Sequence, residues 1–81
     1  MIGLDIHYNG TKWWYRSDQR HRLNGPAVIT SAGDYHWFYN GVRHRTSGPA
    51  VILTNGFREY WFNDKHVTEF EHMFLTGNTH D

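Results

Sequence analysis

The sequence predicts a mostly all-β fold: an antiparallel meander of about six strands, built from three 23-residue β-hairpin repeats and followed by a short C-terminal helix. The segment 21–29, HRLNGPAVI, returns 23 residues later as segment 44–52, HRTSGPAVI. At the same offset the turn glycines align (Gly10, Gly33, Gly56), as do the aromatic pairs Trp14-Tyr15, Trp37-Phe38 and Tyr60-Trp61. A fixed period in the twenties is typical of repeat architectures, in which one unit cannot bury its apolar face alone.

The length and composition indicate one small domain, 1–81, with repeats at about 3–24, 25–47 and 48–66. The chain has no cysteine, which excludes a disulfide scaffold and a zinc site with cysteine ligands. Lys+Arg and Asp+Glu both number 8, so no net basic field favours nucleic-acid binding. No apolar run approaches the roughly 18 residues of a membrane span, and no signal-peptide pattern precedes the first repeat. We therefore expect a cytoplasmic protein with no membrane partner.

Turn signals place the strands along the chain. We expect six, at 3–9, 11–16, 27–31, 34–39, 50–54 and 57–62. Tight turns should join them in pairs, at Asn9-Gly10, Ala32-Gly33 and Asn55-Gly56, because Asn and Gly accept positive φ. Pro26 lacks an N–H group and therefore suits the first position of a strand. We expect Asn40-Gly41 to begin a longer connection to the third repeat.

The C-terminal segment changes from strand to helix signals. Thr68 and Glu71 form a capping-box pattern, and Gly77 is a natural C-cap, which together predict a helix over 69–76. Its apolar residues Phe70, Met73 and Phe74 share one face, so we expect that the helix lies over part of the sheet. Residues 78–81 are expected to form a loose tail.

Strand alternation predicts that both faces of the sheet are aromatic. One face should carry Trp14, Trp37 and Tyr60, and the other Tyr15, Phe38 and Trp61. A single sheet cannot cover both of its faces, so strong curling, the C-terminal tail, a second subunit or a ligand must cover one of them. We expect a homodimer as one solution.

The pattern of segment 37–50, aromatic-aromatic-x-Asn-Gly-x-x-His-Arg-x-x-Gly-Pro-Ala, resembles a repeat of phage, giant-virus and bacterial proteins and is similar to MORN-type β-hairpin repeats. The resemblance covers almost the whole chain and is strongest in the second and third copies. The first copy has no Gly-Pro-Ala, and the last has Asn63-Asp64 where Asn-Gly would stand. The resemblance implies a phage-like origin and a binding role, because MORN proteins act as scaffolds and binding surfaces.

Arginines and exposed aromatic residues are the best candidates for a binding site. Guanidinium groups bind carboxylates or phosphates bidentately, and aromatic side chains suit a protein hot spot or a nucleotide base. The candidate set is Trp13, Arg20, Arg22, Tyr35, His36, Arg43 and Arg45. We expect the four arginines to line one edge of the sheet. Alternatively, they are paired with Asp18, Asp34 or Asp64, or held in cation–π contact.

Metal binding and catalysis have weaker support. His21 and His44 should stand two strands, or roughly 9–10 Å, apart, which is too far for one shared ion. We expect instead that each bonds a carbonyl of its own loop. No nucleophile motif or phosphate loop is visible, so we expect no enzyme, no cofactor and no metal, although His36 with Glu59 on one face remains open as an acid–base pair.

The sequence therefore favours a non-enzymatic binding module. Our preferred hypothesis is a small phage-encoded protein that binds and modulates a host protein, a defence or transcription component, in the host cytoplasm. The alternative is a protein that sequesters a nucleotide-like small molecule in an aromatic, Arg and His pocket at a dimer interface.

Overall fold

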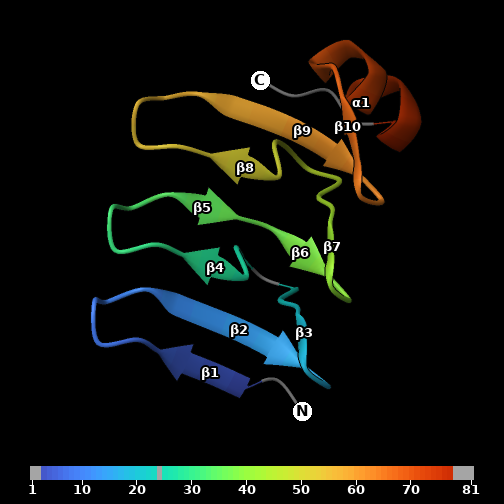
Figure 1. The fold of residues 1–81 in the computed structure, drawn as a ribbon. Coiled ribbons are helices and arrows are strands. Elements are labelled where there is room, and N and C mark those ends of the chain that lie inside the picture. The colour runs from blue at the N-terminus through green and yellow to red at the C-terminus, as the bar shows by residue number, and fades with distance from the viewer. Residues whose placement is uncertain (1–2, 24, 78–81) are drawn as a thin grey trace.

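The computed structural model describes residues 3–23 and 25–77. It is a thin slab, 38 × 29 × 18 Å, in which successive hairpins stack from β1 to β9 and α1 lies at the far end (Figure 1). The strands are β1 (Gly3–Ile6), β2 (Lys12–Arg16), β3 (Gln19–Arg20), β4 (Val28–Ile29), β5 (Tyr35–His36), β6 (Phe38–Tyr39), β7 (Val42–Arg43), β8 (Val51–Ile52), β9 (Arg58–Phe62) and β10 (Lys65–Val67). The helix is α1 (Glu69–Thr76).

The topology confirms the predicted antiparallel meander. The main sheet has the order β1-β2-β4-β5-β8-β9-β10, with β3 paired to β2, while β6 and β7 form a second small sheet. Every neighbouring pair is antiparallel, as between β8 and β9, where Val51 faces Glu59. Within the described residues the strand count is ten, higher than the six expected. The expected strand at 34–39 is divided into β5 and β6, and the other three extra strands, β3, β7 and β10, run across one end of the sheet (Figure 1).

Two-residue turns produce those extra strands. Asn40 and Gly41 have φ of 49° and 86°, so they form a tight hairpin turn between β6 and β7 where a longer connection was expected. Ser17 and Asp18 occupy the same position in the first repeat, with φ of 50° and 64°. In the third repeat Asn63 and Asp64 have φ of 48° and 69°, so the loop keeps its geometry without glycine.

The turns at the opposite end are also equivalent. Gly10, Gly33 and Gly56 have φ of 93°, 97° and 88°, as the tight-turn signals predicted. In each turn the glycine N–H donates to the carbonyl three residues before it, at 2.9 Å. The 23-residue period of the sequence is therefore a period of the structure.

The Gly-Pro-Ala-Val segments join one repeat to the next. The Trp14 N–H donates to the Ala27 carbonyl at 2.7 Å, and the Trp37 N–H donates to the Ala50 carbonyl at the same distance. Both alanines are fully buried, so no larger side chain fits at this junction. With these alanines, the buried apolar core is small: Ala27, Val28, Ala50, Val51, Tyr60 and Val67.

The helix forms where predicted, but its contact face differs. Thr68 caps the N-terminus with a complete capping box, and Gly77 ends the helix with φ 72°. Phe70 and Phe74, expected on the sheet side, are 74% and 82% exposed. His72 is instead fully buried, because it lies on the side of the helix opposite Phe70 and Phe74 and faces β9. The expected tail at 78–81 lies outside the described residues.

Candidate functional site

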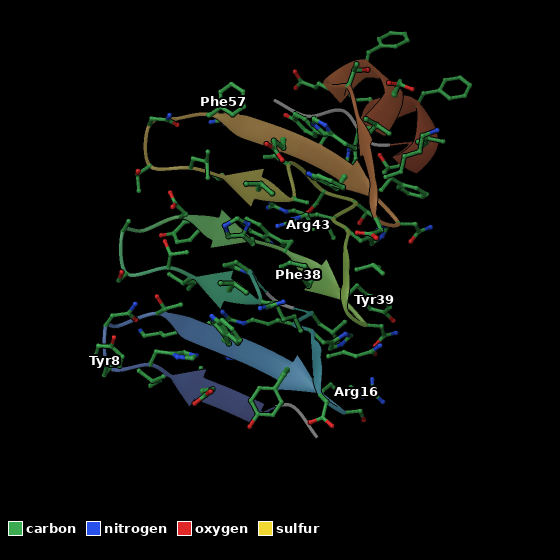
Figure 2. The ribbon with its side chains drawn as sticks, in the orientation of Figure 1. Tyr8, Arg16, Phe38, Tyr39, Arg43 and Phe57 are labelled. Atoms are coloured by element: carbon green, nitrogen blue, oxygen red, sulfur yellow. The ribbon has the colours of Figure 1, made fainter. Side chains whose placement is uncertain are left out.

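The site is a ladder of aromatic rings, arginines and one histidine on one face of the sheet. We call it the arginine–aromatic face and define it by six residues: Trp13, Arg20, Phe38, Arg43, Trp61 and His66. Figure 2 shows Phe38 and Arg43 side by side in the middle of the sheet. Each residue comes from a different strand, which distributes the ladder over all three repeats.

The arginines of this face lie between pairs of rings. The Arg20 guanidinium carbon is 4.3 Å from the Trp13 ring centroid and 5.5 Å from that of Phe38. The Arg43 guanidinium carbon is 5.2 Å from the Phe38 ring centroid and 5.3 Å from that of Trp61. Cation–π contacts of this kind hold a guanidinium in place without neutralising it. At the end of the ladder His66 stacks on Trp61 at 5.1 Å.

Strand pairing explains why these side chains meet. Phe38 is directly opposite Arg43 in the β6–β7 hairpin, and Trp61 is directly opposite His66 in β9–β10. Directly opposed residues point to the same face of a sheet. The link between the first two repeats is made by the Gly41 N–H, which donates to the Arg20 carbonyl at 2.9 Å.

His36 lies near Arg43 and Arg20, whose charges both act on its imidazole. Burial lowers the pKa of its imidazole below the usual 6.5, and the charge of Arg43 lowers it further. The side-chain atoms His36 Nδ1 and Arg43 Nε are both buried without a hydrogen-bond partner. Glu59 shares this face, but its carboxylate accepts the Trp61 indole N–H at 3.0 Å. The charge of Glu59 also acts on His36, in the direction that raises the imidazole pKa, so the two side chains lie near each other and their acid–base pairing stays a prediction.

The opposite face carries the other two predicted arginines. Arg22 lies 3.9 Å from the Trp14 ring centroid, and Arg45 lies 3.9 Å from that of Trp37. Each guanidinium also donates to the proline carbonyl four residues on, at 3.3 Å and 3.0 Å. Burial lowers the pKa of Arg45 from its usual value. Tyr35 is on this face too, edge-on to Trp37 at 6.3 Å.

The expectation of one arginine rim is therefore wrong. Arg20 and Arg43 belong to one face and Arg22 and Arg45 to the other, because Arg22 and Arg45 lie beyond the ends of β3 and β7, where strand alternation no longer holds. All four guanidinium groups make cation–π contacts and are not paired with carboxylates. Among the described residues no arginine forms an ion pair, and the Asp34 carboxylate accepts the Thr54 N–H instead.

A cleft of about 530 Å³ opens beside the second pair of arginines. Its cationic lining residues are Arg22 and Arg45, His44 lies with them, and no carboxylate of the described residues lines it. Burial lowers the pKa of His44 from 6.5. Thr46 and Ser47 add hydroxyl groups, so the cleft is suited to an anionic group.

His21 and His44 connect repeats. The Asn40 N–H donates to Nδ1 of His21, and the Asn63 N–H donates to Nδ1 of His44, both at 2.9 Å. The expectation of a bond to a carbonyl in the same loop was wrong, since both imidazoles accept from a turn of the next repeat. In the part of the chain that the structure describes, no three His, Asp or Glu side chains are grouped as metal ligands.

The sequence missed three members of the site: Phe38, Trp61 and His66 as partners of the arginines. A signal was present, because Arg20, Arg43 and His66 stand 23 residues apart. Arg20, Arg43 and His66 reach the rings because they lie on the extra strands β3, β7 and β10, which were not predicted.

No family model, curated protein or solved structure matches the chain. The resemblance to MORN-type repeats stays a prediction from the sequence. No helix within 3–23 or 25–77 has the length and apolarity to cross a membrane.

Proposed function

We propose that the chain is a non-enzymatic binding module that binds and modulates a host protein, as a small phage-encoded accessory protein, through its arginine–aromatic face. The observation that supports this proposal is the ladder itself, in which Arg20 and Arg43 lie between rings and have no carboxylate partner among the described residues. Trp and Arg are the side chains that contribute most to protein interfaces when they are clustered and held in place. Preorganisation lowers the entropy that binding costs.

The experiment is affinity capture from nuclease-treated host extract with mass spectrometry of the bound proteins. The tagged protein is compared with the Arg20→Gln/Arg43→Gln variant. The matched control, Arg16→Gln/Arg58→Gln, removes the same charge from side chains that are exposed and belong to the opposite face. We expect one stoichiometric host protein, a defence or transcription component, that the control retains and the first variant loses. A partner that both variants retain would contradict the site, and the lack of any partner would contradict the function.

A second candidate function is sequestration of a nucleotide-like small molecule. The cleft of about 530 Å³ favours it, since ligand pockets are typically about 300–1,000 Å³ and this one is lined by Arg22, His44 and Arg45. The cleft lies within one chain, so this function needs no dimer interface. Absorbance near 260 nm that leaves the purified protein on denaturation is the expected sign. Protein free of such a ligand, with no binding of added nucleotides, would exclude it.

The homodimer expected from the sequence is a separate proposal. Large exposed apolar side chains such as Tyr8, Phe57 and Phe74 motivate it. Sedimentation equilibrium up to millimolar protein tests it, and a monomeric mass throughout would contradict it.

A further inference from the structure

We infer that the arginine–aromatic face recognises an acidic protein segment that presents two carboxylates about 10 Å apart, as on one side of a helix. This inference rests on the proposed function and specifies the partner's chemistry.

Neither arginine forms an ion pair within the described chain. Among the described residues His7 and Asp5 form an ion pair at 3.6 Å, whereas no carboxylate lies within 4 Å of the Arg20 or Arg43 guanidinium. Each guanidinium carbon lies over two rings, and the N–H donors of a guanidinium point outward in its own plane. A carboxylate that approaches in this plane can form a bidentate pair with the guanidinium.

Strand order sets the spacing of the two cations. Arg20 is on β3 and Arg43 on β7, with Phe38 of β6 between them. Two strand spacings give about 9–10 Å. Two residues seven apart on a helix are about 10.5 Å apart along its axis and lie on nearly the same side. Glutamates at such positions match the two guanidinium groups.

The surroundings favour a polypeptide over a nucleic acid. Carboxylates lie toward both ends of this face: Asp5 opposite Trp13 in the β1–β2 pair, and Glu59 beside Trp61. They would repel the continuous charge of a phosphate backbone, and the chain has no net charge. A cleft of about 460 Å³ next to Arg20 is lined also by Trp13, Tyr15 and Asp18, and its aromatic side offers space for an apolar side chain of the same segment.

The test uses the ¹⁵N-labelled full chain and synthetic helical peptides. The first peptide is built on alanine with two glutamates seven residues apart, the second has glutamine in their place, and the third has the glutamates four residues apart. A single-stranded uridine hexanucleotide is the fourth probe. Arginine Nε–Hε and tryptophan indole signals report binding at 50 mM and 200 mM salt. The peptide comparison uses the unaltered protein, so it does not depend on the folding of a variant.

We expect the first peptide to shift the signals of Arg20, Arg43 and Trp61, with affinity at least tenfold higher than that of the glutamine peptide and lower at the higher salt. The control Arg16→Gln/Arg58→Gln should bind it unchanged. Equal affinity for the glutamine peptide, or equal affinity for the four-residue spacing, would overturn the inference. Tighter binding of the oligonucleotide at the same signals would also overturn it. A host partner that needs Arg20 and Arg43 but has no acidic segment would overturn this inference and leave the proposed function intact.

Discussion

Replacing His72 tests what holds α1 against the sheet. Its imidazole is fully buried, its ring centroid is 5.3 Å from that of Tyr60, and Nε2 is hydrogen-bonded to the carbonyl of Arg45. A carbonyl can only accept, so Nε2 carries the proton and donates. His72→Ala removes the donor and the ring together, whereas His72→Gln keeps an N–H donor at a similar reach and removes the ring.

The magnitude follows from these two contacts. Leaving the buried Arg45 carbonyl without its donor costs about 1–3 kcal/mol. Losing the buried ring contact with Tyr60 adds about 1 kcal/mol of burial. We therefore expect His72→Ala to lower the free energy of unfolding by about 2–4 kcal/mol. In a domain of this size each kcal/mol lowers Tm by about 4–8 °C, which gives a decrease of roughly 10–25 °C.

Urea unfolding followed by tryptophan fluorescence and thermal unfolding followed by circular dichroism measure the effect. His72→Gln should lose about 1–2 kcal/mol, because it retains the hydrogen bond to Arg45. If His72→Ala unfolds within about 0.5 kcal/mol of the unaltered protein, α1 is not held by this residue. If the two variants lose the same free energy, the hydrogen bond contributes nothing and the reasoning on the carbonyl is refuted.

Three further changes test other parts of the fold. Burial lowers the pKa of His36 and His44 below 6.5, so the unfolded chain binds protons first as the pH falls. The free energy of unfolding should therefore be highest above about pH 6.5 and decrease below it. Urea midpoints at about pH 7.5 and about pH 5.5 measure this change. Thr68→Ala removes the N-cap and should cost about 1 kcal/mol in thermal unfolding, with Thr68→Ser near neutral. Asp64→Gly should raise stability by up to about 1 kcal/mol, because φ of 69° favours glycine.

Each of these has a contrary outcome. Urea midpoints that stay level or rise between pH 7.5 and pH 5.5 would mean that the imidazoles do not stay neutral on folding. A Thr68→Ala variant as stable as the parent would mean that the capping box is dispensable. An Asp64→Gly variant less stable than the parent would show that the aspartate contributes more than its backbone strain costs.

The features that the sequence predicted are those set by local chemistry. The repeat period, the Gly10, Gly33 and Gly56 turns, and the bounds of α1 with its caps all depend on residues within a few positions of one another. Backbone preferences of glycine and side-chain capping act at that range, whatever the rest of the chain does.

The features that it did not predict depend on contacts between repeats. Ser17-Asp18 has no glycine, so its positive φ values were not signalled, and β3 was missed with it. Arg20 and Arg22 differ by two positions, yet they lie on opposite faces because the chain leaves β3 between them and no longer alternates as one strand. The prediction of which face of α1 is buried was wrong, because it placed the apolar stripe against the sheet. His72 is buried there instead, and it hydrogen-bonds the Arg45 carbonyl, which an apolar residue could not do.

The junctions between repeats also determine how the molecule could change in length. Trp14 bonds to Ala27 in the same way that Trp37 bonds to Ala50, so the bond that ends one copy is the bond that starts the next. A duplicated 23-residue copy inserted at such a junction could form the same Trp N–H to Ala carbonyl bond with the repeat on each side of it. Each duplication would add one arginine and one ring to the arginine–aromatic face and lengthen it by about 10 Å. The reach of such a surface would therefore evolve in whole steps, by copy number, without redesign of any single contact.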